Sequence, residues 1–195
     1  QGLRYKPNRL KKINPGLLQI LKEMIKLTKS FKDPEGVGLA ATQVGLDGRF
    51  FVARLHDSKQ VPRAVGIASG DVRPSEPGQR KERWANYQKD FVAVINPKIL
   101  FLSKATKTYF EGCLSIPTIW GEVKRHVSIK VSFQDIKGNP VTKTLKGIPA
   151  WIFQHEVDHL DGKLFTERVL EQKGKFYKFK GKDNTDTDIF DEITI

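Results

Sequence analysis

The chain of 195 residues contains one cysteine, Cys113, and one methionine, Met24. A single cysteine cannot form an internal disulfide bond, so a disulfide-stabilised secreted scaffold is excluded and a reducing compartment is expected. No run approaches the ~20 consecutive apolar residues of a membrane-spanning helix, and no signal-peptide pattern is visible, so we expect no membrane partner. Because the chain opens at Gln1, we expect that translation starts upstream. The expected location is the cytoplasm, with an organelle, after removal of a transit peptide, as the alternative.

The chain also has too few acidic residues to balance its basic ones. It carries 34 Lys and Arg against 22 Asp and Glu, which gives a formal net charge of +12. Such a surface favours solubility, or it attracts a polyanion such as ribosomal RNA. No zinc-finger, helix-turn-helix or RNA-stacking pattern accompanies the charge, so we expect no specific nucleic-acid recognition, while association with the ribosome stays open.

Hydrophobic periodicity predicts an α+β fold. Asn14-Pro15 is a helix-start signal, and the apolar spacing after it predicts an amphipathic helix over 15–30. Alternating apolar residues over 127–133 and a second run over 141–145, joined by a turn, predict a hairpin. The apolar run from Ile148 onward predicts a buried helix. We therefore expect antiparallel strands wrapped around a central buried helix that carries an H-E-x-D-H motif.

Composition divides the chain into two regions. Residues 1–170 are predicted to form one catalytic domain with a long insertion loop over 58–89, where Pro, Gly, Ser and charged residues dominate. Residues 171–195 are first basic and then acidic. We expect this tail to be partly disordered.

The predicted helix carries a metal-binding pattern. His155 and His159 are four residues apart, so both imidazoles project from one helix face and can reach one metal ion. Glu156 points near the same site without having to be a ligand. It can therefore hold or remove a proton from metal-bound water.

Two histidines leave the coordination sphere incomplete. Zinc peptidases of the H-E-x-x-H type usually add a ligand downstream, where Asp161, Glu167 and Glu171 stand without a recognisable pattern. The other candidate is Cys113, because a thiolate is a good ligand for zinc or ferrous iron. Two histidines and one cysteine with an open fourth position would make a catalytic site.

A third segment, from Gly36 to Gly45, is rich in glycine and alanine and includes Gln43. Its small residues leave room for a ligand, and Gln43 supplies a neutral amide donor. By itself this pattern is more often only a turn. It is not a phosphate-binding loop, because no Lys-Ser/Thr pair closes it.

Taken together, the three segments resemble the peptide deformylase family. The family motifs G-x-G-x-A-A-x-Q, E-G-C-x-S and Q-H-E-x-D-H are matched by 36–43, 111–115 and 154–159. The resemblance implies a metal-dependent hydrolase that removes the N-formyl group from the N-terminal methionine of newly synthesised polypeptides and releases formate. Its partners would be nascent N-formylmethionyl peptides. It implies one divalent ion, typically Fe²⁺ with Zn²⁺ or Ni²⁺ as substitutes, held by the residues matched here by Cys113, His155 and His159.

The resemblance also implies roles for other residues. Glu156 would be the general base, and the Gln43 side chain and the Leu114 backbone N–H would donate to the oxyanion. Gly38 would offer backbone hydrogen bonds to the peptide. Five further residues would contact the substrate, the first four around the methionine side chain and the last on the outer cleft: Val37, Ile148, Trp151, Ile152 and Trp120.

One further pair concerns the cysteine loop. We expect Arg125 to pair with Glu111 and to position that loop, as an exposed ion pair that contributes little to stability.

Two alternatives remain. A metallopeptidase of the H-E-x-x-H type would need a downstream third ligand, so a coordinating Cys113 would argue against it. A catalytically silent, basic ribosome- or RNA-binding protein with the same fold would be free to lose Glu156 or a ligand, and every motif residue is present here.

Overall fold

The computed structural model describes residues 2–31, 35–55, 91–185 and 187–194, which form two antiparallel sheets and the helices that cover them. The first sheet has the strand order β1-β2-β3-β6-β7 and the second β4-β5-β8-β9. The strands are β1 (Gly38–Ala40), β2 (Phe50–Arg54), β3 (Phe91–Leu102), β4 (Thr106–Cys113), β5 (Ile116–His126), β6 (Ser128–Gln134), β7 (Pro140–Lys146), β8 (Phe176–Lys182) and β9 (Asp188–Ile193). The helices are α1 (Pro15–Ser30), α3 (Ile148–Leu160) and α4 (Phe165–Gln172), with short 3-10 turns η1 (Gly2–Arg4) and η2 (Ala41–Val44).

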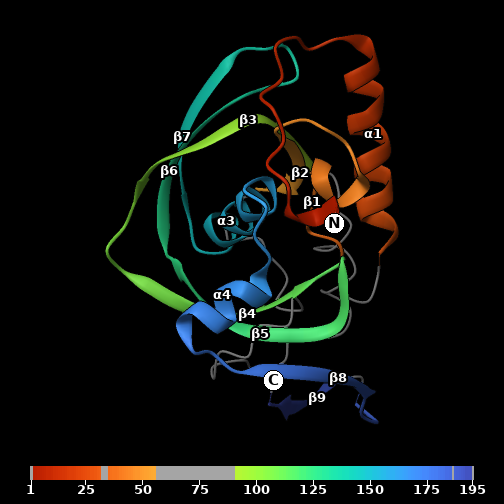
Figure 1. The fold of residues 1–195 in the computed structure, drawn as a ribbon, viewed down its shortest axis with the longest axis vertical. Coiled ribbons are helices and arrows are strands. Elements are labelled where there is room, and N and C mark those ends of the chain that lie inside the picture. The colour runs from red at the N-terminus through yellow and green to blue at the C-terminus, as the bar shows by residue number, and fades with distance from the viewer. Residues whose placement is uncertain (1, 32–34, 56–90, 186, 195) are drawn as a thin grey trace.

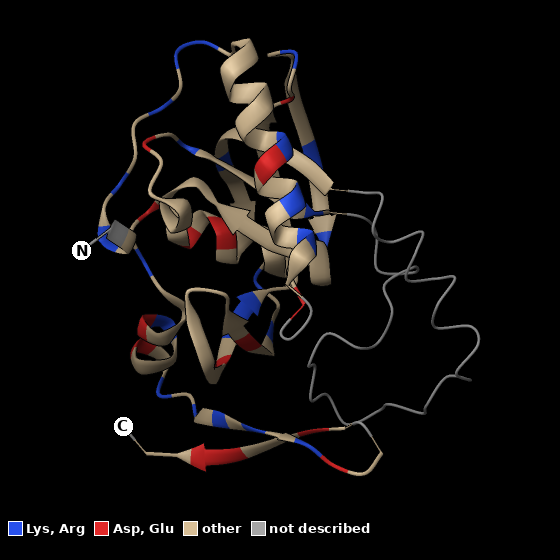
Figure 2. Cartoon of the chain, turned by 90° about the vertical axis from the view of Figure 1, so that its right-hand side faces the viewer, with Lys and Arg blue, Asp and Glu red and all other residues tan. Residues whose placement is uncertain are grey.

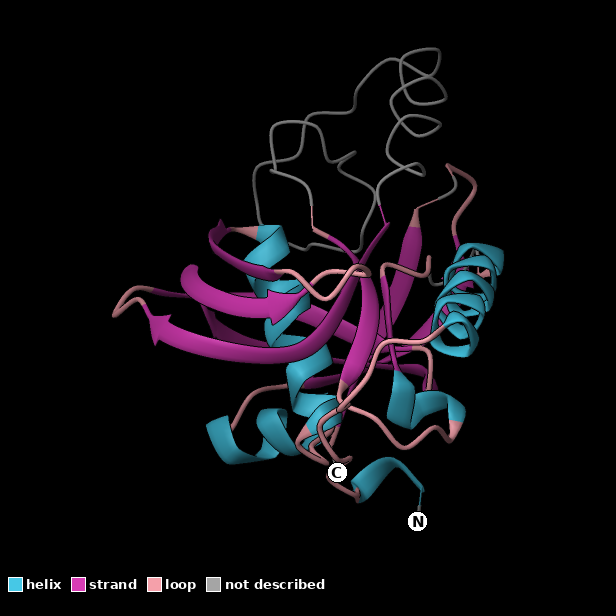
Figure 3. Ribbon diagram, turned by 90° about the horizontal axis from the view of Figure 1, so that it is seen from above, coloured by secondary structure: helices cyan, strands magenta, loops and turns pink. Residues whose placement is uncertain are grey.

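The helix α3 occupies the centre of the molecule, as predicted, and strands of both sheets pass around it (Figure 1). Of its 13 residues, 11 are buried. Phe153 and Leu160 are fully enclosed in the main core, where Phe153 meets Phe51 of β2 edge to face at 5.2 Å. Figure 3 shows the same helix from above, among the strands. Because α3 is enclosed, the ionisable side chains that it carries must find partners inside the protein.

The helix α1 begins and ends where the sequence predicts, and its N-cap is Asn14, whose side chain accepts from the Leu17 N–H at 2.9 Å. It covers the face of β1 and β2 that points away from α3, where Leu21 packs with Val52. The strand β2 is therefore buried on both faces, which explains its unbroken apolar run. The predicted hairpin is also confirmed as β6 and β7, with Ile129 opposite Leu145.

The C-terminal tail differs from the expectation of partial disorder, because β8 and β9 form a hairpin that pairs with β5. Lys180 of β8 forms an ion pair with Asp191 of β9 at 2.8 Å. Figure 2 shows basic residues along β8 and acidic residues along β9. Phe179 lies opposite Phe190 in the same ladder. The change of charge sign that suggested a frayed tail is thus a cross-strand pattern, since opposite charges and aromatic pairs stabilise facing strands.

The predicted insertion over 58–89 lies outside the described residues. The division into a catalytic domain and a tail stays a prediction. Among the described residues, no helix combines the length and apolar character that crossing a membrane requires.

Candidate metal centre

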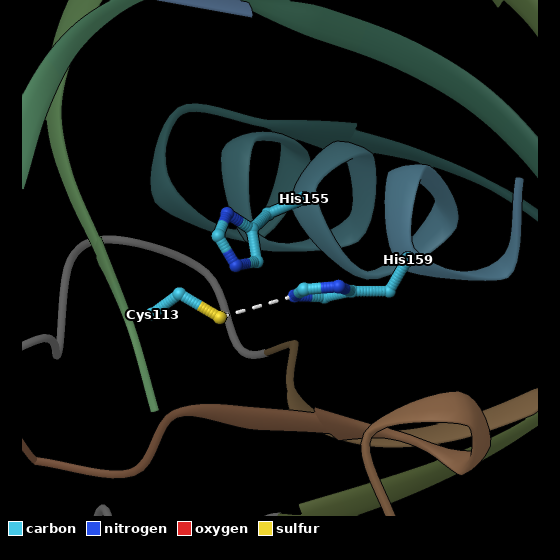
Figure 4. A group of neighbouring side chains, drawn as sticks. All are labelled: Cys113, His155 and His159. Carbon is cyan, nitrogen blue, oxygen red and sulfur yellow. Dashed lines mark hydrogen bonds between the residues drawn. The ribbon is translucent and has the colours of Figure 1, made fainter. Parts of the chain in front are cut away.

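Three side chains from two elements converge at the centre of the fold. Cys113, at the end of β4, points toward His155 and His159 on α3 (Figure 4). The Cys113 Sγ atom lies 3.3 Å from His159 Nε2, and one potential ligand atom from each residue lies within 4.8 Å of the others. A thiolate and two imidazoles suit zinc or iron. Within the described ranges this is the group of side chains able to hold a metal ion.

The surroundings of Cys113 favour the ionised form of its thiol. Burial alone raises the pKa of the Cys113 thiol, but hydrogen bonds and positive charge from the two histidines outweigh it and hold that pKa well below its usual value. Burial lowers the pKa of His155, while Cys113 and Glu111 raise it further than burial lowers it. The thiol therefore ionises readily, and a thiolate is the form that binds metal.

A buried carboxylate orients the first histidine. Glu111 Oε2 accepts from His155 Nδ1 at 3.0 Å, which leaves Nε2 of that ring for an ion. Arg125 donates to both oxygens of Glu111, at 2.7 and 2.9 Å, and the Trp151 indole N–H donates to Oε1 at 2.8 Å. Burial raises the pKa of Glu111, but Arg125 and His155 together lower it to about 2. The ionised Glu111 therefore orients His155, a candidate ligand, and Trp151, which lines the cavity.

The expected pair of Arg125 and Glu111 forms, but it is not exposed. The two side chains are 5% and 0% exposed, so the expectation of a weak surface pair was wrong. The reason is that both face α3, where Arg125 also donates to Asp158 at 2.5 Å. Arg168 of α4 also donates to both oxygens of Asp158, at 2.6 and 3.0 Å, so Glu111, Arg125, Asp158 and Arg168 form one network of ion pairs.

Glu156 is buried beside the three convergent side chains, with 3% of its surface exposed. Its Oε2 atom has no hydrogen-bond partner among the described residues. Burial raises its pKa to about 7, although His155 and His159 oppose that shift. Gly38 leaves the space for this carboxylate, because a Cβ there would lie 2.2 Å from Glu156 Oε1. A glutamate of this kind can gain or lose a proton near neutral pH.

Gln43 in the turn η2 directs its amide group toward the cysteine. Its Oε1 atom accepts from the Ala40 N–H at 2.8 Å, which fixes the orientation of the amide. Its Nε2 atom donates to Ser115 Oγ at 3.0 Å and lies 3.5 Å from Cys113 Sγ. The amide N–H groups therefore face the same space as the thiol.

A cavity opens beside the convergent side chains. Most of the site residues proposed from the sequence line this cavity. The lining residues are Glu35, Val37, Gly38, Gln43, Gly112, Cys113, Leu114, Trp120, Trp151, Ile152, His155 and Glu156. Ile148 is not among the lining residues and packs against the main core, because it sits in the first turn of α3, away from the motif.

Sequence reasoning missed the contribution of Asp158, Arg168 and Glu35. Asp158 stands between the two histidines of the motif, and the burial predicted for this helix implied a cationic partner for it. No local signal identified that partner, because Arg125 and Arg168 lie on other elements. Glu35 lines the cavity and pairs with the buried Arg54.

Comparisons with known proteins point to one family. Residues 1–175 match the model of a family described as polypeptide deformylase. The peptide deformylase of Thermotoga neapolitana is 34% identical over 171 residues, which cover 88% of this chain and 83% of that protein. The crystal structure of the Thermotoga maritima enzyme superposes with a TM-score of 0.64 at 34% identity, covering 86% of this chain and 90% of that one. The Synechococcus elongatus enzyme in complex with actinonin gives 0.66 at 29% identity over 86% of this chain and 74% of that one.

Proposed function

The chain belongs to the polypeptide deformylase family, and on this premise we propose that Cys113, His155 and His159 hold its divalent ion. As a peptide deformylase, the enzyme removes the N-formyl group from the N-terminal methionine of nascent polypeptides. We propose Fe²⁺ as the native ion, with Zn²⁺ or Ni²⁺ as substitutes, because a thiolate and two imidazoles suit all three. The observation that carries the assignment is the convergence of one sulfur and two ring nitrogens within 4.8 Å, beside a buried carboxylate oxygen that has no hydrogen-bond partner in the described part of the chain.

When bound, the ion would act as a Lewis acid that polarises the formyl group and makes water a better nucleophile. Glu156 is the general base of the proposed reaction: it accepts a proton as the water oxygen bonds to the formyl carbon. It then delivers that proton to the amine nitrogen as the carbon–nitrogen bond breaks, and formate leaves. A pKa near 7 suits both transfers, because the group can be unprotonated before the first and protonated before the second.

Two donors stabilise the negative charge that develops on the formyl oxygen. We assign this role to the amide N–H of Gln43, which faces the thiol, and to the backbone N–H of Leu114, which lies in the cavity wall. Removal of one such donor costs about 3–4 kcal/mol of barrier in comparable hydrolases.

The apolar part of the cavity suits a methionine side chain. Val37, Trp151 and Ile152 line it, and we propose that the Gly38 backbone binds the peptide. Trp120 would contact the residues that follow methionine. Ile148 receives no substrate contact in this proposal, because it lies outside the lining.

The test measures formate release from formyl-Met-Ala-Ser under anaerobic conditions with ferrous iron, alongside metal content. Glu156→Ala is expected to retain the ion and lose turnover, because the base is not a ligand. Cys113→Ser is expected to lose the ion. Glu171→Gln, a surface carboxylate whose side chain is 48% exposed, is the matched control and should behave like the parent. Metal loss in Glu156→Ala, or parent-like metal retention in Cys113→Ser, would contradict the assigned roles.

We further propose that the enzyme acts in the cytoplasm, or in an organelle with its own translation, in association with the ribosome. The net charge of +12 supports this, because ribosomal RNA is a polyanion. Co-sedimentation with ribosomes that weakens steeply as salt rises is the expected result. Binding that does not respond to salt would exclude an electrostatic association.

A further inference from the structure

Five aromatic rings gather on one face of the second sheet, and we call this cluster the aromatic face: Phe110, Trp120, Tyr177, Phe179 and Phe190. The Phe110 and Trp120 rings stack at 5.3 Å with an interplanar angle of 12°. Phe190 of β9 packs edge to face against both, at 4.9 Å from Phe110 and 5.5 Å from Trp120. The C-terminal hairpin lies next to β5 (Figure 1) and reaches Trp120 through Phe190.

Trp120 connects this cluster to the catalytic cavity. Its indole lines the cavity and lies over Gly112, where an added Cβ would be 2.9 Å from the ring. Gly112 directly precedes Cys113 in the chain. A shift of the Trp120 ring would therefore change the cavity wall beside the metal centre.

The aromatic face is not the face that holds the hairpin on the protein. The opposite face of the sheet packs against α4 through Phe176 and Ile193, which join the core around Val169. Phe110, Trp120 and Phe190 instead remain partly exposed. Aromatic rings that are stacked but still accessible offer a rigid apolar surface to a ligand.

We propose that Phe190 is a positioning residue that holds Trp120 in the wall of the cleft, so that the C-terminal hairpin determines how tightly the enzyme binds the residues after formyl-methionine. The proposal rests on the proposed function of the same site. It predicts a preference for apolar side chains at the second and third positions of the nascent chain, because those side chains would lie against the ring of Trp120, which lines the cavity. Phe190 itself lies beyond the ring of Trp120 and acts through it.

The test compares two substrates, formyl-Met amide and formyl-Met-Leu-Phe. In Phe190→Ala the KM for formyl-Met-Leu-Phe should rise about 3- to 10-fold with kcat unchanged, since aromatic contacts of this kind contribute on that scale. Both constants for formyl-Met amide should stay at the parent values. Phe190→Tyr keeps the ring and should restore the KM. Ile189→Ala, on the same strand and 43% exposed, is the matched control and should match the parent.

A mutant cycle distinguishes positioning from a general structural effect. The double variant Phe190→Ala with Trp120→Ala should bind formyl-Met-Leu-Phe no more weakly than Trp120→Ala alone. Three results would each overturn the proposal. They are an equal rise in KM for both substrates, losses of binding free energy that add in the double variant, and an unchanged KM for formyl-Met-Leu-Phe in Phe190→Ala. If Phe190→Ala does not fold, Phe190→Leu, which removes the ring but keeps apolar volume, takes its place in the same comparison. A parent enzyme that releases formate from neither substrate would instead refute the proposed function.

Discussion

Gly38→Ala tests most directly whether the position of Glu156 determines turnover. The added methyl group would lie 2.2 Å from Glu156 Oε1 and 2.7 Å from its Cδ atom, more than 1 Å short of ordinary contact for the oxygen. The backbone itself tolerates alanine, because Gly38 pairs with Ala53 in a regular antiparallel ladder and lies outside the positive-φ glycines. The carboxylate must therefore move.

The expected effect is large on kcat and modest on stability. A displacement of about 1 Å in a catalytic group can cost on the order of 10²-fold in rate, within the 10²–10⁴-fold that a general base contributes. Overpacking of a buried site costs about 1–3 kcal/mol of unfolding free energy. The three proposed metal ligands are untouched, so the metal content should equal that of the parent.

The assay combines steady-state formate release, metal analysis and urea unfolding. Gly16→Ala near the start of α1 is the control for a glycine-to-alanine change, because its Cβ meets nothing nearer than 3.4 Å. The double variant Gly38→Ala with Glu156→Ala should be no slower than Glu156→Ala alone, since both changes remove the same function. A Gly38→Ala enzyme with the parent kcat would refute this reasoning, and so would a double variant in which the losses of kcat from the two changes combine.

Three other predictions concern the buried charges and the metal. Arg125→Met leaves the carboxylates of Glu111 and Asp158 without their shared cation and should lower the unfolding free energy by about 3–5 kcal/mol in urea; a loss below 1 kcal/mol would contradict a buried network. The pKa of Glu111 is lowered from 4.5 to about 2, so its ionised form stabilises the fold above pH 4.5, and this stabilisation disappears as the pH falls toward 2. The difference in unfolding free energy between the parent and Glu111→Gln should therefore shrink over that range. A difference that stays constant would contradict this prediction. Removing the metal with a chelator should lower the thermal midpoint of the parent, and added Zn²⁺ should restore it; Cys113→Ser should respond less, and an equal response would argue against cysteine ligation.

The sequence by itself determined the elements whose causes are local. The Asn14 cap and the spacing of apolar residues predicted α1 from Pro15 to Ser30, and strict alternation predicted the hairpin of β6 and β7. The two histidines could be placed on one face because helical geometry relates residues four apart without any tertiary information. The three motifs also indicated the family, which the comparisons confirm.

Only the tertiary structure decided which distant groups meet. Cys113 joins the histidines because β4 ends against α3, and no local pattern encodes that distance. Arg125 was expected on the surface, but a strand that faces a central helix buries its charge between Glu111 and Asp158. Gly38 is expected from the sequence to offer its backbone to a peptide, whereas only the structure shows that it also leaves space for the carboxylate of Glu156, more than a hundred residues away. Contacts of this kind arise from the packing of elements remote in sequence, and periodicity reports only which face of an element is buried, not what it is buried against.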